Sequence, residues 1–325
     1  RSTAGLVRGI LASPADIYHV GKPQPINGLA ALVGICLLRG RRFYLDCDDD
    51  ETHSNRLNRW QRAVFAFWER LTVQIAAGST VNTRYLAARN RQAGHTHVVY
   101  VPNGVDLARF QLPAPDVVNG LRTALQLEGC PVVAYFGSLA LQNHPVDLLL
   151  DAFVQVHRTT PETRLLVIGG GDDLALLQEM ADGLGLGGVA LFTGHVAQTA
   201  LPELLALATV TVDPVHDNSV ASARSPLKVF ESLALGIPVV TADVGDRAEL
   251  LQQGAAGVLV APGDADALAQ GILSVLGDEE RRAAMGQAGR QHMRARYAWP
   301  RLAADWATLY AGETDQPAPH RSTHS

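Results

Sequence analysis

Short runs rich in β-branched residues alternate with helical patterns along nearly the whole chain. This alternation is typical of parallel sheets covered by helices, so it predicts the α/β class. In the first part, strands are predicted at residues 16–21, 42–47, 79–82 and 97–102, with helices at 55–71 and 83–92. Later in the chain, strands are predicted at 131–137, 163–170, 188–194, 209–214, 237–243 and 257–262.

The length of 325 residues suits two domains rather than one. Prolines interrupt the pattern at 110–120, which predicts a first domain over 1–114 and a second over 115–296. The first domain has fewer strands, and the chain begins with Arg1 rather than Met, so we expect the first domain to be incomplete at its amino terminus. Residues 297–312 predict a last amphipathic helix, and residues 313–325 have the composition of a disordered tail.

Composition excludes several classes of protein. A formal net charge of −5 argues against a general nucleic-acid binder. The three cysteines are scattered and odd in number, which favours a reducing cytoplasm and gives neither a disulfide framework nor metal-ligand spacing. The longest apolar run, residues 26–38, is too short to span a membrane and predicts a buried helix.

The stretch SPLKVFESLALGIPVV, residues 225–240, predicts a helix with an unusual first turn. Ser225 suits the N-cap and Pro226 the first helical position, but Lys228 lies where the helix dipole favours negative charge. An anion entering there would meet Lys228, Arg224 and free backbone donors. A solvated lysine, with Glu231 as a mere helical ion-pair partner, is the alternative interpretation.

Other candidate ligand contacts follow predicted strands, because ligands bind at the carboxyl ends of parallel strands. Gly137 and Ser138 form one small-residue turn, and Gly169 begins the GGGDD turn. Leu174 stands where a dinucleotide fingerprint needs glycine, and no P-loop sequence occurs, which disfavours nicotinamide and ATP-hydrolase functions. A purely structural glycine turn is an equal alternative at Gly169.

The chain from about residue 97 to 312 resembles family 4 retaining glycosyltransferases of the GT-B fold. The matching stretches are VPNGVDLARF (101–110), YFGSLALQNHPVDLLLDAF (135–153), RLLVIGGGDD (164–173), VALFTGHV (189–196), LPELLALATVTVDP (201–214), SPLKVFESLALGIPVVTADVGDRAELL (225–251) and YAWPRL (297–302). The resemblance implies two Rossmann-like domains, with a C-terminal helix that packs back towards the first.

The resemblance also implies roles for residues of the second domain. Lys228 would contact the diphosphate of a nucleotide sugar, Arg224 would assist it, and Glu231 would bind the ribose hydroxyls; these three form the catalytic set. The implied donor-binding set is Gly137, Ser138, Gly169, His195, Val196, Ser225, Pro226, Leu227, Lys228 and Glu231, with His195 and Val196 bordering the base.

The sequence departs from the family pattern in two places. Many members carry two glutamates eight positions apart, but Ala223 stands where the first would be. The family's usual arginine and lysine in the first phosphate loop are replaced by Ser138 and by Asn143 or His144.

On the acceptor side, the candidates are His19, Lys22, Asp48 and Asp49. Asp48 and Asp49 belong to an acidic run over residues 46–51, for which a solvated acidic turn is the rival interpretation. We expect no metal, because GT-B enzymes generally do not depend on a bound divalent ion.

The implied function is transfer of a hexosyl group, with retention, from a nucleotide-diphosphate sugar to a sugar, polysaccharide or lipid-linked acceptor. The alternatives are a nucleotide-sugar 2-epimerase of the same fold and a non-catalytic nucleotide-sugar-binding protein. No cofactor or nucleic-acid partner is expected. Members often make cell-envelope polysaccharides in the cytoplasm, and some work at the inner face of the cytoplasmic membrane. The resemblance therefore implies a cytoplasmic protein, and it extends to peripheral association with that inner face. No segment stands out as a basic amphipathic helix.

Overall fold

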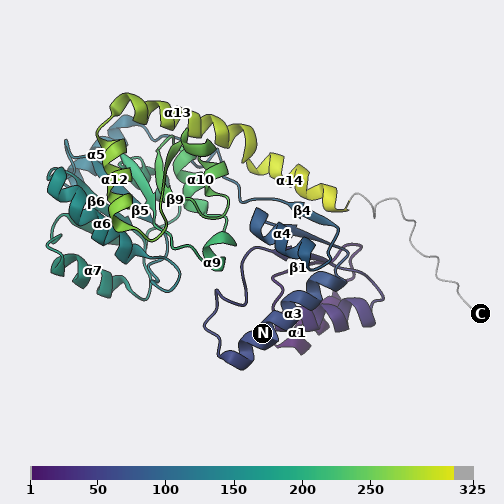
Figure 1. The fold of residues 1–325 in the computed structure, drawn as a ribbon. Helices are drawn as coiled ribbons and strands as arrows, with labels where there is room; N and C mark the ends of the chain where they lie inside the picture. Colours follow the sequence, from purple (N-terminus) through teal and green to yellow (C-terminus); the bar gives the residue numbers. More distant parts are fainter. Residues whose placement is uncertain (1, 311–325) are drawn as a thin grey trace, which may run out of the picture. The chain divides into compact units, whose positions relative to one another are not determined.

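The structure, a computed structural model, describes residues 2–310, which fall into two compact units (Figure 1). Among the described residues, the first unit comprises 2–102 and 300–310, and the second comprises Asn103–Trp299. Each unit has its own parallel sheet. The tail predicted at 313–325, and the end of the helix predicted at 297–312, lie outside the described residues.

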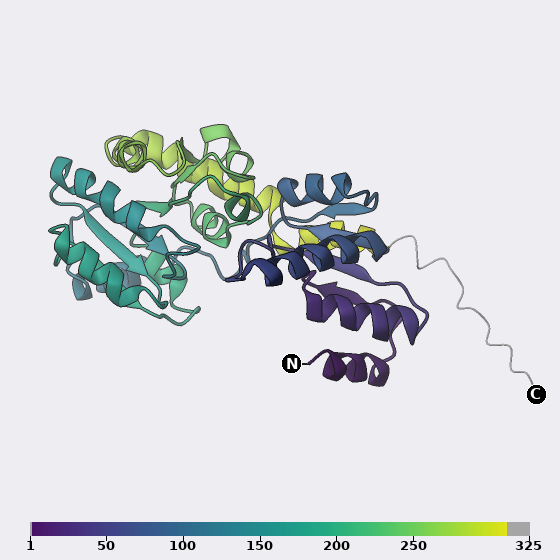
Figure 2. The ribbon, with the colours of Figure 1, turned by 60° about the horizontal axis from the view of Figure 1, so that its bottom comes forward.

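The sheet of the first unit has four parallel strands in the order β1-β2-β3-β4. They are β1 (His19–Gly21), β2 (Tyr44–Cys47), β3 (Gly78–Val81) and β4 (Val98–Tyr100), so all four predicted strands form. The helices are α1 (Thr3–Ala12), α2 (Pro25–Ala30), the π-helix η1 (Ala31–Leu37), α3 (Arg59–Ile75) and α4 (Arg84–Gln92). Figure 2 shows α1, α2 with η1, and α3 side by side in one layer.

The helix predicted at 26–38 forms as α2 and η1, but it is only half-buried. Gly28, Ala31 and Ile35 are buried, whereas Leu37 and Leu38 are 69% and 57% exposed. The prediction of a buried helix is therefore confirmed only in part: α1 and α3 both pack against this segment, but Ile26, Leu29, Leu37 and Leu38 stay exposed.

The last described segment, α14 (Trp299–Ala307) followed by the 3-10 helix η3 (Thr308–Tyr310), returns to the first unit. The Tyr310 ring packs edge-on against Tyr44, with ring centroids 4.9 Å apart, and Leu309 is fully buried. The expected packing of a C-terminal helical segment on the first domain is thus present.

The second unit has six parallel strands in the order β10-β9-β8-β5-β6-β7. They match the six predicted strands and are β5 (Val132–Phe136), β6 (Arg164–Ile168), β7 (Ala190–Gly194), β8 (Val210–Asp213), β9 (Val239–Ala242) and β10 (Gly257–Val260). The chain runs outward from β5 to β7 and then returns to the other side of β5 at β8. The strand order therefore reverses between β5 and β8.

Helices cover both faces of this sheet, and strand alternation divides the core between them. Ala134 and Phe136 belong to one buried cluster, whereas Val133 and Tyr135 belong to the cluster on the other face. The longer helices are α5 (Pro115–Ala124), α6 (Val146–Thr159), α7 (Leu174–Gly183), α10 (Leu227–Ala234), α12 (Ala265–Leu276) and α13 (Glu279–Arg296). Shorter ones are α8 (Leu201–Leu205), α9 (Ser219–Ser222), α11 (Arg247–Leu250) and η2 (Gln252–Gly254).

The boundary between the units lies at Pro102/Asn103 rather than at residues 114/115. The backbone N–H of Val105 donates to the carbonyl of Tyr297 at 2.9 Å, and Val105 and Phe110 are buried in the core of the second unit. The prolines at 113 and 115 precede and begin α5 instead of separating domains, because proline is well tolerated in the first helical turn.

None of the helices in the described part of the chain is both long enough and apolar enough to cross a membrane.

Candidate functional site

The reversal of strand order between β5 and β8 marks the place where open α/β sheets bind ligands, at the carboxyl ends of the strands. The register aligns Val133 with Val210, so the ends of the two strands bring Gly137 and Asp213 to the same edge. The Lys228 side chain from the first turn of α10 reaches this point. This edge is the candidate site of the second unit.

Lys228 is a largely buried lysine, with a side chain only 13% exposed. Its Nζ lies 3.4 Å from Oδ1 of Asp213 and 4.4 Å from the centre of the Tyr135 ring. Burial alone would lower the pKa of Lys228, but Tyr135 and Asp213 outweigh it and raise that pKa. Lys228 is therefore a fixed cation and not a solvated side chain.

Asp213 joins two cations in the interior. Its Oδ2 accepts from Nε of Arg247 at 2.8 Å, and the side chains of both residues are nearly inaccessible to solvent. Burial raises the pKa of Asp213, but Arg247 and Lys228 outweigh that effect and hold it below its usual range. One carboxylate thus faces two positive charges, which leaves a surplus cation at the strand edge.

Arg224, just before α10, adds a further positive charge. Its NH1 donates to the carbonyl of Asn143 at 3.0 Å, in the loop that follows β5. Burial, Lys228 and Arg224 lower the pKa of His144 in the same loop to about 3, so His144 is neutral. The cations that the resemblance expects within this loop are absent from it, and Arg224 and Lys228 approach it from the α10 side.

The glycine turns after β5, β6 and β7 are connected by backbone hydrogen bonds. Gly137 N–H donates to Ile168 O at 3.0 Å, and Gly169 N–H donates to Gly194 O at 3.1 Å. A Cβ on Gly169, where φ is +143°, would lie 2.0 Å from the carbonyl oxygen of Gly137. The geometry therefore requires glycine at 169 for close backbone approach.

Gly137 and Ser138 are exposed at the edge of the sheet, and a Cβ on Gly137 would lie 3.6 Å from Nζ of Lys228. A ligand over the Gly137 turn would therefore meet the Lys228 ammonium directly. His195 is exposed at the end of β7, whereas Val196 packs against the core.

The residues before α10 hold the chain in place. Ser225 is not the N-cap: Pro226 occupies that position with an extended backbone, and α10 begins at Leu227, which is exposed. Instead, the Ser225 hydroxyl accepts from the backbone N–H of Asn103 at 3.0 Å, and the Asn103 amide donates to the Ser225 carbonyl. The PNGVD turn thereby fixes the start of α10.

Glu231 lies one turn after Lys228 and is half-buried. Burial raises its pKa to about 7, although Arg109 opposes this shift. Within residues 2–310, no hydrogen bond or ion pair engages its carboxyl group. Glu231 therefore does not form the helical ion pair with Lys228 that the sequence left open, since Lys228 is bound to Asp213.

Ala223, at the position where many family members have a glutamate, follows α9 and is fully buried. A longer, charged side chain there would need a different local packing.

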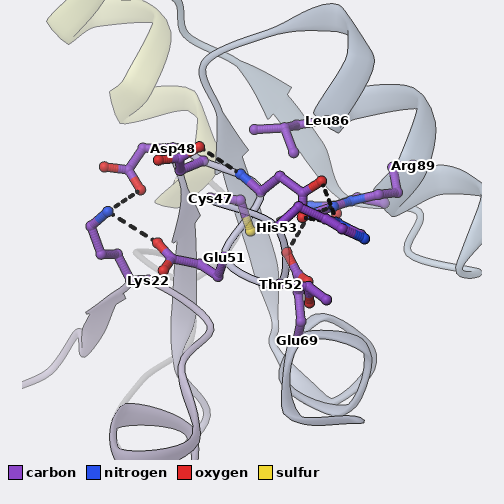
Figure 3. A network of polar contacts seen from close by, with 12 residues as sticks. Lys22, Cys47, Asp48, Glu51, Thr52, His53, Glu69, Leu86 and Arg89 are labelled. Carbon is purple, nitrogen blue, oxygen red and sulfur yellow. Dashed lines mark hydrogen bonds and ion pairs between the residues drawn. The ribbon is translucent and has the colours of Figure 1, made fainter. Parts of the chain in front are cut away.

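In the first unit, Lys22 follows β1 and connects two acidic residues. Figure 3 shows its ammonium between Asp48 and Glu51, at 3.2 and 3.0 Å. Burial alone would lower the pKa of Lys22, but Glu51 and Asp48 raise it. Lys22 also has a left-handed backbone with φ of +63°, a strained conformation for a residue other than glycine and one that clusters at functional sites.

The rest of the acidic run is not the solvated turn that the sequence allowed. Glu51 and Asp50 are only 2% and 1% exposed. Glu51 accepts from Gln24 at 2.7 Å, and Asp50 binds His53 at 2.9 Å and Arg89 at 3.4 Å. Arg89 also pairs with the buried Glu69 (Figure 3). Asp49 accepts from the backbone N–H of Asp50 and so fixes the turn.

His19 is the first residue of β1 and is only partly accessible. Its Nδ1 bonds the hydroxyl of Tyr310, and its ring centroid lies 5.4 Å from that of Trp306. Burial lowers the pKa of His19, although Asp46 opposes the shift. In the part of the chain that the structure describes, no group of three His, Cys, Asp or Glu residues is placed to hold a metal ion.

Comparison with known proteins decides the family. The family model described as "Glycosyl transferases group 1" matches residues 122–292, more than half of the chain. The chain belongs to this family. The matched segment contains the Gly137 turn, Asp213 and the whole of α10.

Curated relatives have similar sequences. The chain is 32% identical over 235 residues to the GDP-mannose-dependent alpha-(1-6)-phosphatidylinositol monomannoside mannosyltransferase of Mycolicibacterium smegmatis, which covers 72% of the chain and 60% of that protein. It is 30% identical over 260 residues to the D-inositol 3-phosphate glycosyltransferase of Thermobispora bispora, covering 76% of the chain and 59% of that protein. The chain thus spans about 60% of the length of these relatives.

Among solved structures, Anabaena Alr3699/HepE in complex with UDP and glucose is similar to the chain, with a TM-score of 0.79 and 20% identity. The alignment covers 95% of the chain and 81% of that structure. This likeness shows the fold, and the GT-B assignment made from the sequence is confirmed.

Asp213, Tyr135 and Arg247 were not predicted from the sequence as site residues. Asp213 could have been found, because it ends a predicted strand and the rule that located Gly137 applies to it equally. Tyr135 and Arg247 gave no such signal, since an aromatic residue inside a strand and an arginine after a loop are ordinary features.

Proposed function

We propose that this protein transfers a hexosyl group from a nucleotide-diphosphate sugar to a sugar, polysaccharide or lipid-linked acceptor, with retention at the anomeric carbon. One observation carries the proposal: the buried ammonium of Lys228 lies beside the exposed Gly137 turn at the reversal of strand order. A diphosphate seated there would be bound by a fixed cation and by the free N–H groups at the start of α10.

In the transfer, the bond between the anomeric carbon and the diphosphate oxygen breaks, and a bond to the acceptor hydroxyl oxygen forms on the same face. The acceptor proton goes to the departing phosphate oxygen, so no separate protein base is needed. Lys228 and Arg224 stabilise the negative charge that develops on the leaving group, because cations held in place need no reorganisation during the reaction. We infer that they make a bound metal ion unnecessary.

We assign the ribose hydroxyls to Glu231 and the edge of the base to His195 and Val196. Glu231 suits this role because it is half-buried and, among the described residues, its carboxyl group has neither a hydrogen bond nor an ion pair. Ser138 and the Pro226–Leu227 segment would line the phosphates, and Gly169 would support the turn from behind.

On the acceptor side, we assign hydroxyl binding to Lys22 and Asp48, with Asp49 shaping the loop. The side chains of Lys22 and Asp48 are about two-fifths exposed, unlike those of Asp50 and Glu51, so they can reach a ligand. The mycolicibacterial relative is named for a phosphatidylinositol monomannoside, which supports a lipid-linked acceptor here. Three free cysteines suit the reducing cytoplasm as the place of reaction.

A non-catalytic nucleotide-sugar-binding protein is the second candidate, and the buried Ala223 favours it because the glutamate that many members place near the donor sugar is absent. An epimerase is distinguished by its reaction, because it changes the donor without any acceptor.

The test is a panel of UDP-, GDP- and ADP-hexoses, assayed with and without lipid and oligosaccharide acceptors, for released nucleoside diphosphate and for the anomer formed. We expect nucleoside diphosphate to be released only when an acceptor is present and from donors of one nucleotide base, with an α-linked product from an α-linked donor.

Lys228→Met should reduce release at least about a hundredfold, since one transition-state contact of this kind is worth about 3 kcal/mol. Arg158→Gln, at an exposed position in the last turn of α6, is the matched control. Binding without release would favour the second candidate, and conversion of the donor to its 2-epimer without acceptor, detected in the recovered nucleotide sugar, would favour the epimerase.

A further inference from the structure

Helix α3 of the first unit exposes apolar side chains that no other described part of the chain covers. Trp60 is 85% exposed, the highest value among the large hydrophobic residues that the structure describes, and Phe67 and Val64 are 59% and 48% exposed. Their spacing of four and then three positions places them in one stripe along the helix. Trp60, Val64 and Phe67 together form the α3 stripe.

The α3 stripe is separate from the side of the helix that packs. Glu69, Thr72 and Val73 are buried. Helix α2 crosses α3 at Gly28, where a Cβ would lie 2.6 Å from Thr72 Cγ2 and 2.7 Å from Trp68 Cε3. The apolar surface of α3 is therefore wider than its neighbours cover, and contiguous exposed apolar surface of this kind marks an interaction site.

Charge on the same helix layer is almost entirely positive. Arg59, Arg62 and Arg70 of α3 are exposed, and Glu69, the sole acidic residue in α1, α2, η1, α3 and α4, is buried against Arg89 and Thr52. The layer of α1, α2, η1 and α3 (Figure 2), together with α4, is thus basic in a chain whose net charge is −5.

The first turn of α3 contains Arg59 and no acidic residue, and Arg62 follows directly. Positive charge at a helix N-terminus is unfavourable to the helix, so these arginines do not serve its stability. A capping box between Asn58 and Gln61 stabilises this end instead.

We propose that α3 is a docking surface for an anionic phospholipid membrane, with the α3 stripe inserted at the level of the headgroups and the arginines bound to phosphates. Tryptophan and phenylalanine prefer the membrane interface, and each arginine near an anionic surface adds electrostatic attraction. A second copy of the chain is a poor occupant, because two such surfaces would bring arginines against arginines. This inference concerns a surface of the first unit and holds whether or not the proposed transfer reaction is correct.

The test is sedimentation of the protein with vesicles in the absence of any substrate. Binding to equal parts of phosphatidylglycerol and phosphatidylcholine should exceed binding to phosphatidylcholine alone at least about tenfold, and it should weaken as salt is added. Trp60→Ala combined with Phe67→Ala should lower binding about tenfold or more, as should Arg59→Gln combined with Arg62→Gln. The arginine pair should not unfold the helix, because its removal relieves an unfavourable dipole interaction.

Matched controls lie on the second unit. Leu176→Ala removes an apolar side chain that is 47% exposed, close to the value for Val64, and Arg158→Gln removes an exposed arginine. Both should bind vesicles as the unaltered protein does. Brominated lipids should quench tryptophan fluorescence in the unaltered protein, and Trp60→Phe should remove most of the quenching while binding persists.

Equal binding to neutral and anionic vesicles, or full binding by the Trp60/Phe67 double variant, would overturn the proposal. So would a dimer, detected by analytical ultracentrifugation, that the double variant abolishes, because the α3 stripe would then be a protein interface.

Discussion

The Lys228 ammonium lies 3.4 Å from the Asp213 carboxylate, which also accepts from Arg247 at 2.8 Å. Asp213 therefore fixes both cations at the edge where β5 and β8 end. Since one negative charge faces two positive charges, the pair fixes Lys228 without neutralising the site. This relationship leads to a prediction that separates stability from ligand binding.

Asp213→Asn should destabilise the fold while nucleotide binding persists. Removing one partner of a buried ion pair costs about 3–5 kcal/mol, and asparagine still accepts a hydrogen bond, so we expect a loss of about 3 kcal/mol in the free energy of unfolding by urea. Affinity for a nucleoside diphosphate, measured by calorimetry, should stay equal or rise because the site becomes more positive. Asp217→Asn, at an exposed position, should change stability by less than about 0.5 kcal/mol. A loss of nucleotide binding in folded Asp213→Asn protein would contradict the account.

Glu231 should make stability depend on pH. Its pKa is raised from 4.5 to about 7, so between these values the folded protein keeps a proton that the unfolded chain has lost. The free energy of unfolding should therefore decrease as pH rises from about 4.5 to about 7, relative to Glu231→Gln, and level off above that range. Urea titrations of both proteins test this, and parallel pH profiles would show that Glu231 is not the responsible group.

The same carboxyl group should make donor binding depend on pH. An ionised carboxylate accepts hydrogen bonds from ribose hydroxyls more strongly than a protonated one, so affinity for the nucleoside diphosphate should rise through about pH 7. Glu231→Gln should bind several-fold more weakly at high pH and should lack this rise. The difference between the two pH profiles isolates Glu231 from ionisation of the ligand itself.

Gly169 should tolerate no side chain. In Gly169→Ala, the new Cβ would lie 2.0 Å from the Gly137 carbonyl oxygen at a φ of +143°, so we expect a loss of at least about 3 kcal/mol in the free energy of unfolding. Gly120→Ala, in the interior of α5 with open space around its Cβ, should instead gain about 0.5–1 kcal/mol. Equal effects of the two substitutions would remove the argument for close backbone approach at Gly169.

Lys22 should affect the acceptor alone. In an assay with donor and acceptor, Lys22→Met should raise the acceptor KM roughly tenfold, because an ammonium contact to hydroxyl groups is lost. Affinity for the nucleoside diphosphate should be unchanged. Lys22 also pairs with the buried Glu51, so urea denaturation must confirm that the variant is folded before the kinetics are compared. A change in nucleotide affinity would place Lys22 outside an acceptor site.

The strands could be predicted from the sequence because parallel strands are buried on both faces. Every residue of Val132–Phe136 is buried, so the segment appears as an uninterrupted apolar and β-branched run. The order of the strands left no comparable signal. The sequence therefore indicated Lys228 and Gly137 separately, but only the pairing of β5 with β8 brings Asp213 to the same place.

Polar residues were harder to interpret than apolar ones. Asp50 and Glu51 lie in an acidic run that is typical of solvated turns, yet their partners Arg89 and Lys22 come from other elements and allow both carboxylates to be buried. The α3 stripe was missed for the opposite reason. Its apolar residues are continuous around the helix with core-facing positions such as Trp68, and sequence alone does not separate the covered part from the exposed part.

Lys22 and Lys228 are the only lysines in the sequence, which allows the central claim to be tested on the unaltered protein. The measurement is an NMR titration of protein labelled selectively at lysine, with Lys228→Arg used once to assign the two side-chain signals. As UDP, GDP or ADP is added, the Lys228 signal should shift until the site is saturated, while the Lys22 signal stays in place. Nucleotide binding detected by calorimetry with no movement of the Lys228 signal would contradict the account.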